Sequence, residues 1–100
     1  MILHFDPAAF AELEQAAEWY EAQRSELRRQ FVAEVRAGLG QILEHPRAWQ
    51  PLGRSVRRYR LSRFPYGIVY EVHDDQILVV AIAHLHRKPG YWKRRLTEGG

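Results

Sequence analysis

The fold of this chain is decided by residues 56–92, which read VRRYRLSRFPYGIVYEVHDDQILVVAIAHLHRKPGYW. Their β-branched and aromatic side chains fall in three short runs, at residues 56–61, 68–72 and 77–83, separated by Pro, Gly and Asp. Such runs are the signature of strands joined by tight turns. The sequence therefore predicts three successive antiparallel strands, with one face of the sheet on a core and the other face open.

The N-terminal residues predict a short strand followed by a helix. Residues 2–5, ILHF, are apolar enough for the strand. Asp6 can accept hydrogen bonds from the free N–H groups of a first helical turn, and Pro7 suits the first helical position. Phe5 and Phe10 have the spacing of a hydrophobic staple across that start. The helical spacing of apolar residues then continues to about residue 23.

A second helix is predicted by a buried stripe at helical spacing, made of Leu27, Phe31, Val35, Leu39 and Ile42. Ser25 is expected to cap it, and His45-Pro46 to end it, because a residue before proline avoids helical geometry. Gly38 and Gly40 each weaken this helix by about 1 kcal/mol relative to alanine. Either another segment approaches the helix closely there, or the helix frays locally. Residues 47–53 predict a loop.

These elements predict one α+β domain over residues 1–100: an N-terminal strand, an antiparallel helical hairpin, an antiparallel sheet of three further strands and a short basic C-terminal segment. One hundred residues with 46% hydrophobic content allow a single core. No run reaches the roughly eighteen apolar residues of a membrane span, and the N-terminus lacks a signal sequence. We therefore expect a cytoplasmic protein with no membrane contact. Without cysteine there is no disulfide or thiolate metal site.

Charge is divided unevenly along the chain. Residues 1–50 hold five Arg and Lys against eight Asp and Glu, a net −3, whereas residues 51–100 hold ten against four, a net +6. This division predicts a basic surface on the sheet half beside an acidic helical half. Nucleic acid, a nucleic-acid-bound machine or an acidic protein would suit such a surface. The alternative is a basic surface that is merely solvated.

The first predicted strand carries two arginines on one face. If Tyr59 and Leu61 face the helices, the alternation of a strand places Arg58 and Arg60 side by side on the open face. Paired guanidinium groups suit phosphates, because their planar donor forks match anionic oxygens. The alternative is that they are solvated arginines that protect an edge strand from aggregation.

Further candidate residues follow the last predicted strand. His84 and His86 point to one face, but no carboxylate or third ligand has helpful spacing, so we expect no metal site and no cofactor. A histidine there could serve as a general base, with Arg87 stabilising a pentacovalent phosphate, or His84 could be a hydrogen-bonded structural residue. The next aromatic and basic residues could contact a target or fold back to cover the sheet edge; they include Lys88, Tyr91, Trp92 and Lys93.

Three segments together carry a family resemblance: DPAAFAELEQAAEWYE, RRYRLSRFPYGIVYEV and ILVVAIAHLHRKPGYW. They resemble the RelE/ParE superfamily of toxins from type II toxin–antitoxin systems, over nearly the whole chain. The resemblance implies a small antiparallel sheet backed by two helices. It also implies a cytoplasmic bacterial protein that is inhibited by an antitoxin wrapped around it. We expect that antitoxin to be acidic and partly disordered.

The superfamily divides by target. RelE-like members cleave messenger RNA in the ribosomal A site, and the resemblance places Arg58, Arg60, Arg87 and Tyr91 near their functional positions. Those members also carry an arginine in a Y-R-x-x-Y pattern. Here residues 66–70 read YGIVY, so Gly67 stands where that arginine would be. A glycine cannot stabilise a phosphorane, although Arg63 or His84 could substitute. The departure favours the ParE-like branch, whose members poison DNA gyrase.

The sequence therefore predicts a ParE-like toxin that inhibits DNA gyrase. Its target-binding surface would comprise Arg58, Arg60, Arg87, Lys88, Tyr91, Trp92 and Lys93. The alternative is a ribosome-dependent mRNA endoribonuclease, in which the same arginines stabilise charge and Tyr91, His84 or His86 moves protons. A third possibility is a non-toxic regulator that only binds its antitoxin.

Overall fold

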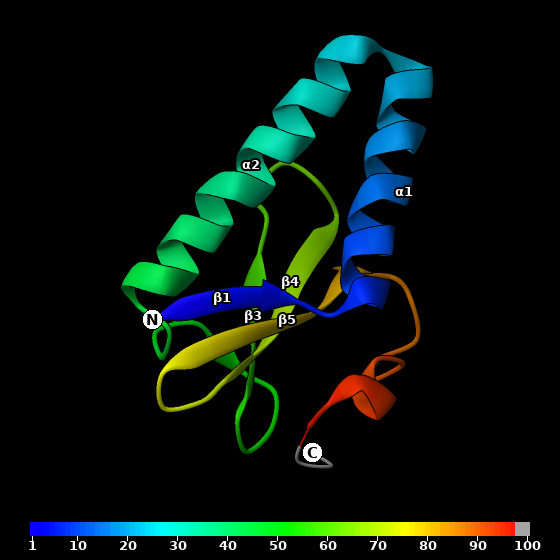
Figure 1. The fold of residues 1–100 in the computed structure, drawn as a ribbon. Coiled ribbons are helices and arrows are strands. Elements are labelled where there is room, and N and C mark those ends of the chain that lie inside the picture. The colour runs from blue at the N-terminus through cyan, green and yellow to red at the C-terminus, as the bar shows by residue number, and fades with distance from the viewer. Residues whose placement is uncertain (98–100) are drawn as a thin grey trace.

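A computed structural model describes residues 1–97 and shows two helices packed on one face of a five-stranded sheet (Figure 1). In chain order the elements are β1 (Ile2–Phe5), α1 (Pro7–Gln23), α2 (Ser25–Glu44), β2 (Gln50–Pro51), β3 (Val56–Arg60), β4 (Tyr66–Val72), β5 (Gln76–His84) and a 3-10 turn, η1 (Lys93–Arg95). The predicted α+β class and the predicted order of strand, helical hairpin and sheet are confirmed.

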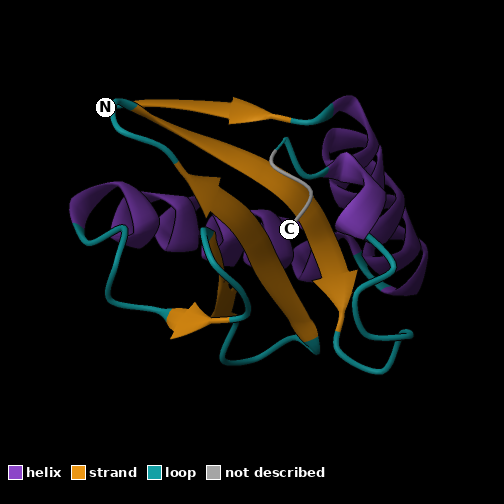
Figure 2. Ribbon diagram, turned by 90° about the horizontal axis from the view of Figure 1, so that it is seen from below, coloured by secondary structure: helices purple, strands orange, loops and turns teal. Residues whose placement is uncertain are grey.

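The strand order is β1-β5-β4-β3-β2 (Figure 2). Strands β3, β4 and β5 form the predicted antiparallel meander. Strand β1 instead pairs in parallel with the first half of β5, from Ile2 opposite Gln76 to Phe5 opposite Val79, so the sheet is mixed. The predicted loop at residues 47–53 contains a short strand, β2, in which Gln50 lies opposite Arg58.

The predicted cap of α1 is confirmed, whereas the predicted cap of α2 is wrong. Asp6 Oδ1 accepts a hydrogen bond from the Ala8 N–H at 2.8 Å, and the rings of Phe5 and Phe10 meet edge to face at 5.9 Å. Ser25 does not cap α2, because the helices are separated by a single extended residue, Arg24, which occupies the capping position. Ser25 is therefore already the first helical residue.

The main core lies between the helices and the inner face of the sheet. Phe31, fully buried, packs against Tyr20 and Phe64 with ring centroids 5.1 and 5.3 Å away. At Gly38 a Cβ would lie 2.8 Å from the ring of Tyr59, so the predicted close approach to α2 is real there. At Gly40 it is wrong, because nothing of the described chain lies within 4 Å of that position.

The outer face of the sheet is covered, contrary to the prediction of an open face. The C-terminal segment folds back on the side away from the helices (Figure 1). Trp92, only 8% exposed, packs there against Val56, Val69 and Val80. A β-bulge assists this packing: Val69 pairs with Ala81 and Tyr70 with Val79, which leaves Val80 as the extra residue of β5. The sheet therefore has an apolar cluster on each face.

None of the helices within residues 1–97 is long and apolar enough to cross a membrane.

Candidate functional site

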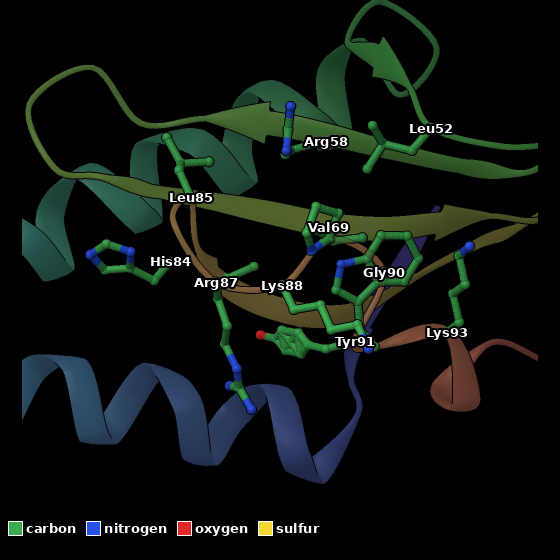
Figure 3. Close-up of a pocket in the computed structure, with 13 residues that line it drawn as sticks. Leu52, Arg58, Val69, His84, Leu85, Arg87, Lys88, Gly90, Tyr91 and Lys93 are labelled. Atoms are coloured by element: carbon green, nitrogen blue, oxygen red, sulfur yellow. The ribbon is translucent and has the colours of Figure 1, made fainter.

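A cleft of about 250 Å³ opens between the outer face of the sheet and the C-terminal segment. Its apolar surface includes Leu52, Val69, Ala83 and Trp92. Figure 3 shows Arg58 with Leu52 and Leu85 along one side, and Arg87, Lys88, Tyr91 and Lys93 along the other. No Asp or Glu of the described chain lines it. The cleft therefore combines apolar contact surface with a cationic lining, which favours an anionic partner.

Most of the residues predicted from the sequence meet at this cleft. The order of β3, β4 and β5 brings the strand residue Arg58 next to the segment that follows β5. Seven predicted residues line it: Arg58, His84, Arg87, Lys88, Tyr91, Trp92 and Lys93. Arg60 lines an adjoining cavity with Arg58, and His86 lines neither. Tyr59 and Leu61 pack toward the helices, as expected, so Arg58 and Arg60 share the outer face.

Arg58 is held over the sheet by its neighbours. A Cβ at Gly67 would lie 2.9 Å from both Cγ and Cδ of Arg58, so the arginine stem occupies that space. Its Nη2 donates a hydrogen bond to Gln50 Oε1 at 2.9 Å, while its buried Nε has no partner within residues 1–97. Burial, and then the nearby charge of Arg60, lowers the pKa of Arg58 from its ordinary value. A bound anion would relieve both effects.

Glu12 of α1 ties the far side of the cleft together. Strand β1 covers β5 only as far as Val79, and beyond it Glu12 Oε1 accepts a hydrogen bond from the Ile82 N–H at 3.0 Å. The same carboxylate receives two hydrogen bonds from Arg95, at 3.0 and 3.1 Å, and one from the Tyr91 hydroxyl at 2.8 Å. Glu12 therefore caps a free strand edge and anchors the C-terminal segment.

Arg87 leaves the cleft toward this carboxylate. Figure 3 shows its side chain running to α1, and its Nη1 lies 3.5 Å from Glu12 Oε2. The contact is long and the side chain is 57% exposed, whereas Glu12 is only 12% exposed. Arg95 is therefore the main ionic partner of Glu12, and Arg87 is a secondary one.

Tyr91 is held in its protonated form. Its ring lies under the Arg87 guanidinium, 3.8 Å from Cζ to the ring centroid, and its hydroxyl donates to Glu12. Burial, followed by the hydrogen bond to Glu12 and the charge of Glu12, raises the pKa of Tyr91 to about 12. At neutral pH this hydroxyl is neither ionised nor free to accept a proton.

The ring of His84, the last residue of β5, is hydrogen-bonded to the backbone of His86. His84 Nδ1 accepts from the His86 N–H at 3.1 Å, and the His84 ring packs against Tyr66 with centroids 5.0 Å apart. These two contacts support the interpretation of His84 as a hydrogen-bonded structural residue. Within residues 1–97 no group of three or more His, Asp or Glu side chains is arranged to hold a metal ion.

Residues 3–89 match the sequence profile of a protein family described as "ParE toxin of type II toxin-antitoxin system, parDE". The chain belongs to this ParE toxin family. Among solved structures it is similar to one described as the chromosomal ParDE TA system from P. aeruginosa, with 18% sequence identity, a TM-score of 0.68, and coverage of 86% of this chain and 97% of that chain. That likeness shows a shared fold. A search of curated proteins finds no match.

Membership of the ParE family implies a cognate antitoxin as partner. The family match ends at residue 89, within the segment that closes the cleft. Glu12 therefore lies inside the matched region, while its partners Tyr91 and Arg95 lie beyond it.

A second carboxylate anchors the same segment farther along. Glu71 of β4 is fully buried on the outer face, and its oxygens accept from the Thr97 N–H at 3.1 and 3.2 Å and from the Thr97 hydroxyl at 3.3 Å. His73 Nε2 lies 3.8 Å from Glu71 Oε1. The C-terminal segment of this ParE toxin is thus held at Glu12 and at Glu71. Its Trp92 packs on the outer face of the sheet.

Proposed function

We propose that this ParE-family toxin inhibits DNA gyrase, and that it does so through the cationic cleft rather than by hydrolysing a substrate. The observation that carries the proposal is a cleft with apolar walls and the cations Arg58, Lys88 and Lys93, which no carboxylate of residues 1–97 lines. Such a surface binds an anionic partner or a partner with an exposed apolar anchor. The DNA that gyrase holds is an anionic partner of this kind.

The ribonuclease alternative lacks support at the residues it needs. The stem of Arg58 fills the space beside Gly67, where the RelE-like pattern would place an arginine. The Tyr91 hydroxyl donates a hydrogen bond to Glu12 and its pKa is raised to about 12, and both effects disfavour the ionised form that a base requires. His84 accepts a backbone hydrogen bond through Nδ1. These contacts favour binding over acid–base catalysis.

We infer further that the cognate antitoxin is acidic and partly disordered, and that it neutralises the toxin as it folds on it. The positive potential of the cleft supports an acidic partner, because opposite charges increase the rate and specificity of association. A disordered segment can cover a large surface at moderate affinity.

The direct test is a supercoiling assay with purified gyrase, run beside an assay for cleavage of messenger RNA on ribosomes. The wild-type toxin is expected to block supercoiling and to leave transcripts intact. A Lys88→Gln/Lys93→Gln double variant is expected to lose inhibition, whereas Arg29→Gln/Arg36→Gln on α2, with the same change in net charge, retains it. If the toxin leaves gyrase supercoiling intact but transcripts are cut, the protein is a ribonuclease instead. If neither activity is affected and the protein still binds its antitoxin tightly, it is a non-toxic regulator.

Arg87→Ala provides a second test in cells. Its side chain is 57% exposed, makes one long contact to Glu12 and lies over the Tyr91 ring, so the variant is expected to fold normally. It should relieve toxicity if Arg87 supports the effector surface, whether by contact or by holding Tyr91 beneath it. Equal killing by Arg87→Ala and wild type, at matched expression, would remove Arg87 from the proposed surface.

A further inference from the structure

A second cavity adjoins the cleft across β3. It has a volume of about 300 Å³ and is lined by Trp49, Gln50, Arg58, Tyr59 and Arg60. Arg58 lines both cavities, so they adjoin at its side chain. Within the described residues, neither lining contains a carboxylate, and neither Arg58 nor Arg60 has an ion-pair partner. The positive charge therefore continues from the cleft across β3.

Two cations that line these cavities, Arg58 and Arg60, stand on β3 at alternate positions. Arg58 and Arg60 are two residues apart on the same face of the strand, and two residues of strand span about 7 Å. One strand of duplex DNA presents roughly two phosphates over that length of helix axis. Lys88 and Lys93 extend the charged surface on the opposite side of the cleft. A polymer with a charge at every repeat matches this arrangement.

We propose that the cleft and the adjoining cavity form a single track for the phosphodiester backbone of DNA, so that the toxin contacts the DNA held by gyrase as well as the enzyme. This inference rests on the proposed function, because gyrase is what brings DNA to the track. Arg58 would make the central phosphate contact and Arg60 the next one.

Arg58 is prepared for this contact by the structure around it. Its aliphatic stem is fixed between β3 and Gly67, and its Nη2 is oriented by Gln50. The buried Nε is a hydrogen-bond donor without a partner in the described chain, beside a second guanidinium group. A phosphate accepts from two guanidinium donors at once and never loses its charge near neutral pH. Binding it between the two guanidinium groups would offset the repulsion between Arg58 and Arg60.

The test measures toxin binding to a labelled duplex of mixed DNA sequence by fluorescence anisotropy over a series of salt concentrations. The logarithm of the association constant falls linearly with the logarithm of salt concentration, and each phosphate contact contributes a slope of about 0.9 in duplex DNA and about 0.7 in single strands. Arg60→Gln and Lys88→Gln are each expected to reduce the slope by about 0.9. Arg36→Gln on α2, an exposed arginine with the same change in net charge, is expected to leave it unchanged.

Two further probes identify the anion. Single-stranded RNA and polyglutamate are each expected to bind more weakly than the duplex at every salt concentration. Preferential binding of RNA would overturn the assignment to DNA. Tighter binding of polyglutamate than of DNA, with the loss specific to Arg60→Gln, would overturn it in favour of an acidic protein partner.

The proposed function is tested separately by gyrase supercoiling with the same protein samples. If the wild type inhibits gyrase while Arg60→Gln and Arg36→Gln give equal salt slopes, the DNA track is wrong and the proposed function stands. If the duplex slopes are as expected but gyrase is not inhibited, the track is supported and gyrase inhibition is wrong.

Discussion

The side chain of Arg58 lies across Gly67 of the neighbouring strand, with Cγ and Cδ 2.9 Å from the point where a Cβ of residue 67 would stand. The two residues are diagonal neighbours, since Arg58 pairs with Val69 and Gly67 pairs with Arg60. Glycine is therefore the residue that allows Arg58 to lie flat on the sheet and reach the cleft. The departure from the RelE-like pattern at Gly67 has a physical consequence: it creates space for a different arginine.

Gly67→Ala should destabilise the toxin through this contact. The added Cβ would displace the Arg58 stem, at a cost of about 1–3 kcal/mol for overpacking. In an Arg58→Ala background the same substitution should cost much less, because the space is then empty. A double-mutant cycle on the free energy of unfolding, measured by urea denaturation, isolates the coupling between the two residues. An equal cost of Gly67→Ala in both backgrounds would show that another contact is responsible.

The two glycines of α2 should respond to alanine in opposite directions. At Gly38 the new Cβ would lie 2.8 Å from the Tyr59 ring and 3.0 Å from Ile68 Cδ1, so Gly38→Ala should lower stability by about 1–3 kcal/mol. At Gly40 nothing in the described structure lies within 4 Å, so Gly40→Ala should raise it by up to about 1 kcal/mol through helix propensity alone. Thermal unfolding of both variants beside wild type measures the difference in sign.

The regular elements of this toxin were predictable because their signals are local. Capping by Asp6, the staple between Phe5 and Phe10, and the helical stripe of α2 each depend on residues within a few positions of one another. The shared outer face of Arg58 and Arg60 follows from the alternation of a single strand. By contrast, β2 has only two residues and no side-chain pattern, and it exists because Gln50 can pair with Arg58.

The parts that escaped prediction depend on contacts between distant residues. Glu12 and Tyr91 are 79 positions apart, and the residues next to each of them in the sequence do not indicate that the two side chains form a hydrogen bond. Glu12 nevertheless stands three residues after Ala9 and four before Ala16, both buried, so its position on the inner side of α1 was readable from helical spacing. The burial of Glu71 depends on Thr97, and the covering of the outer face depends on Trp92, in a segment without periodicity.

Stability should fall in alkaline solution between pH 10 and about pH 12. Burial raises the pKa values of Tyr70 and Tyr91 from an ordinary 10.0 to about 12. The folded state therefore favours the protonated hydroxyls, and this stabilisation is complete below pH 10 and is lost as the pH rises through about 12. Tyr91→Phe keeps the ring beneath Arg87 but removes one titrating group. Urea midpoints across this range should decline less steeply in Tyr91→Phe than in wild type, and parallel curves would contradict the assignment to Tyr91.

Glu12→Gln should release the C-terminal segment from one of its two anchors. The substitution keeps the shape of the side chain but removes the charge that pairs with Arg95, and it turns one oxygen into a donor facing the Tyr91 hydroxyl and Arg95. We expect a loss of about 2–3 kcal/mol in the free energy of unfolding, the range for hydrogen bonds to a charged group. The pKa of Tyr91 should fall as well, because Glu12 is one of the groups that raises it. Glu14→Gln, an exposed acid on the same helix, is the matched control and should change neither quantity.

The same pair of variants links the anchor to function. Glu12 is expected to act on function only by holding the C-terminal segment in place. Because Lys88 and Lys93 of the cleft belong to that segment, Glu12→Gln should weaken gyrase inhibition more than Glu14→Gln. The comparison is made at a temperature where both variants are fully folded. Unfolding curves establish the folded range, and supercoiling assays within it give the comparison. Equal inhibition by the two variants, despite the expected loss of stability, would show that the position of the segment does not control the effector surface.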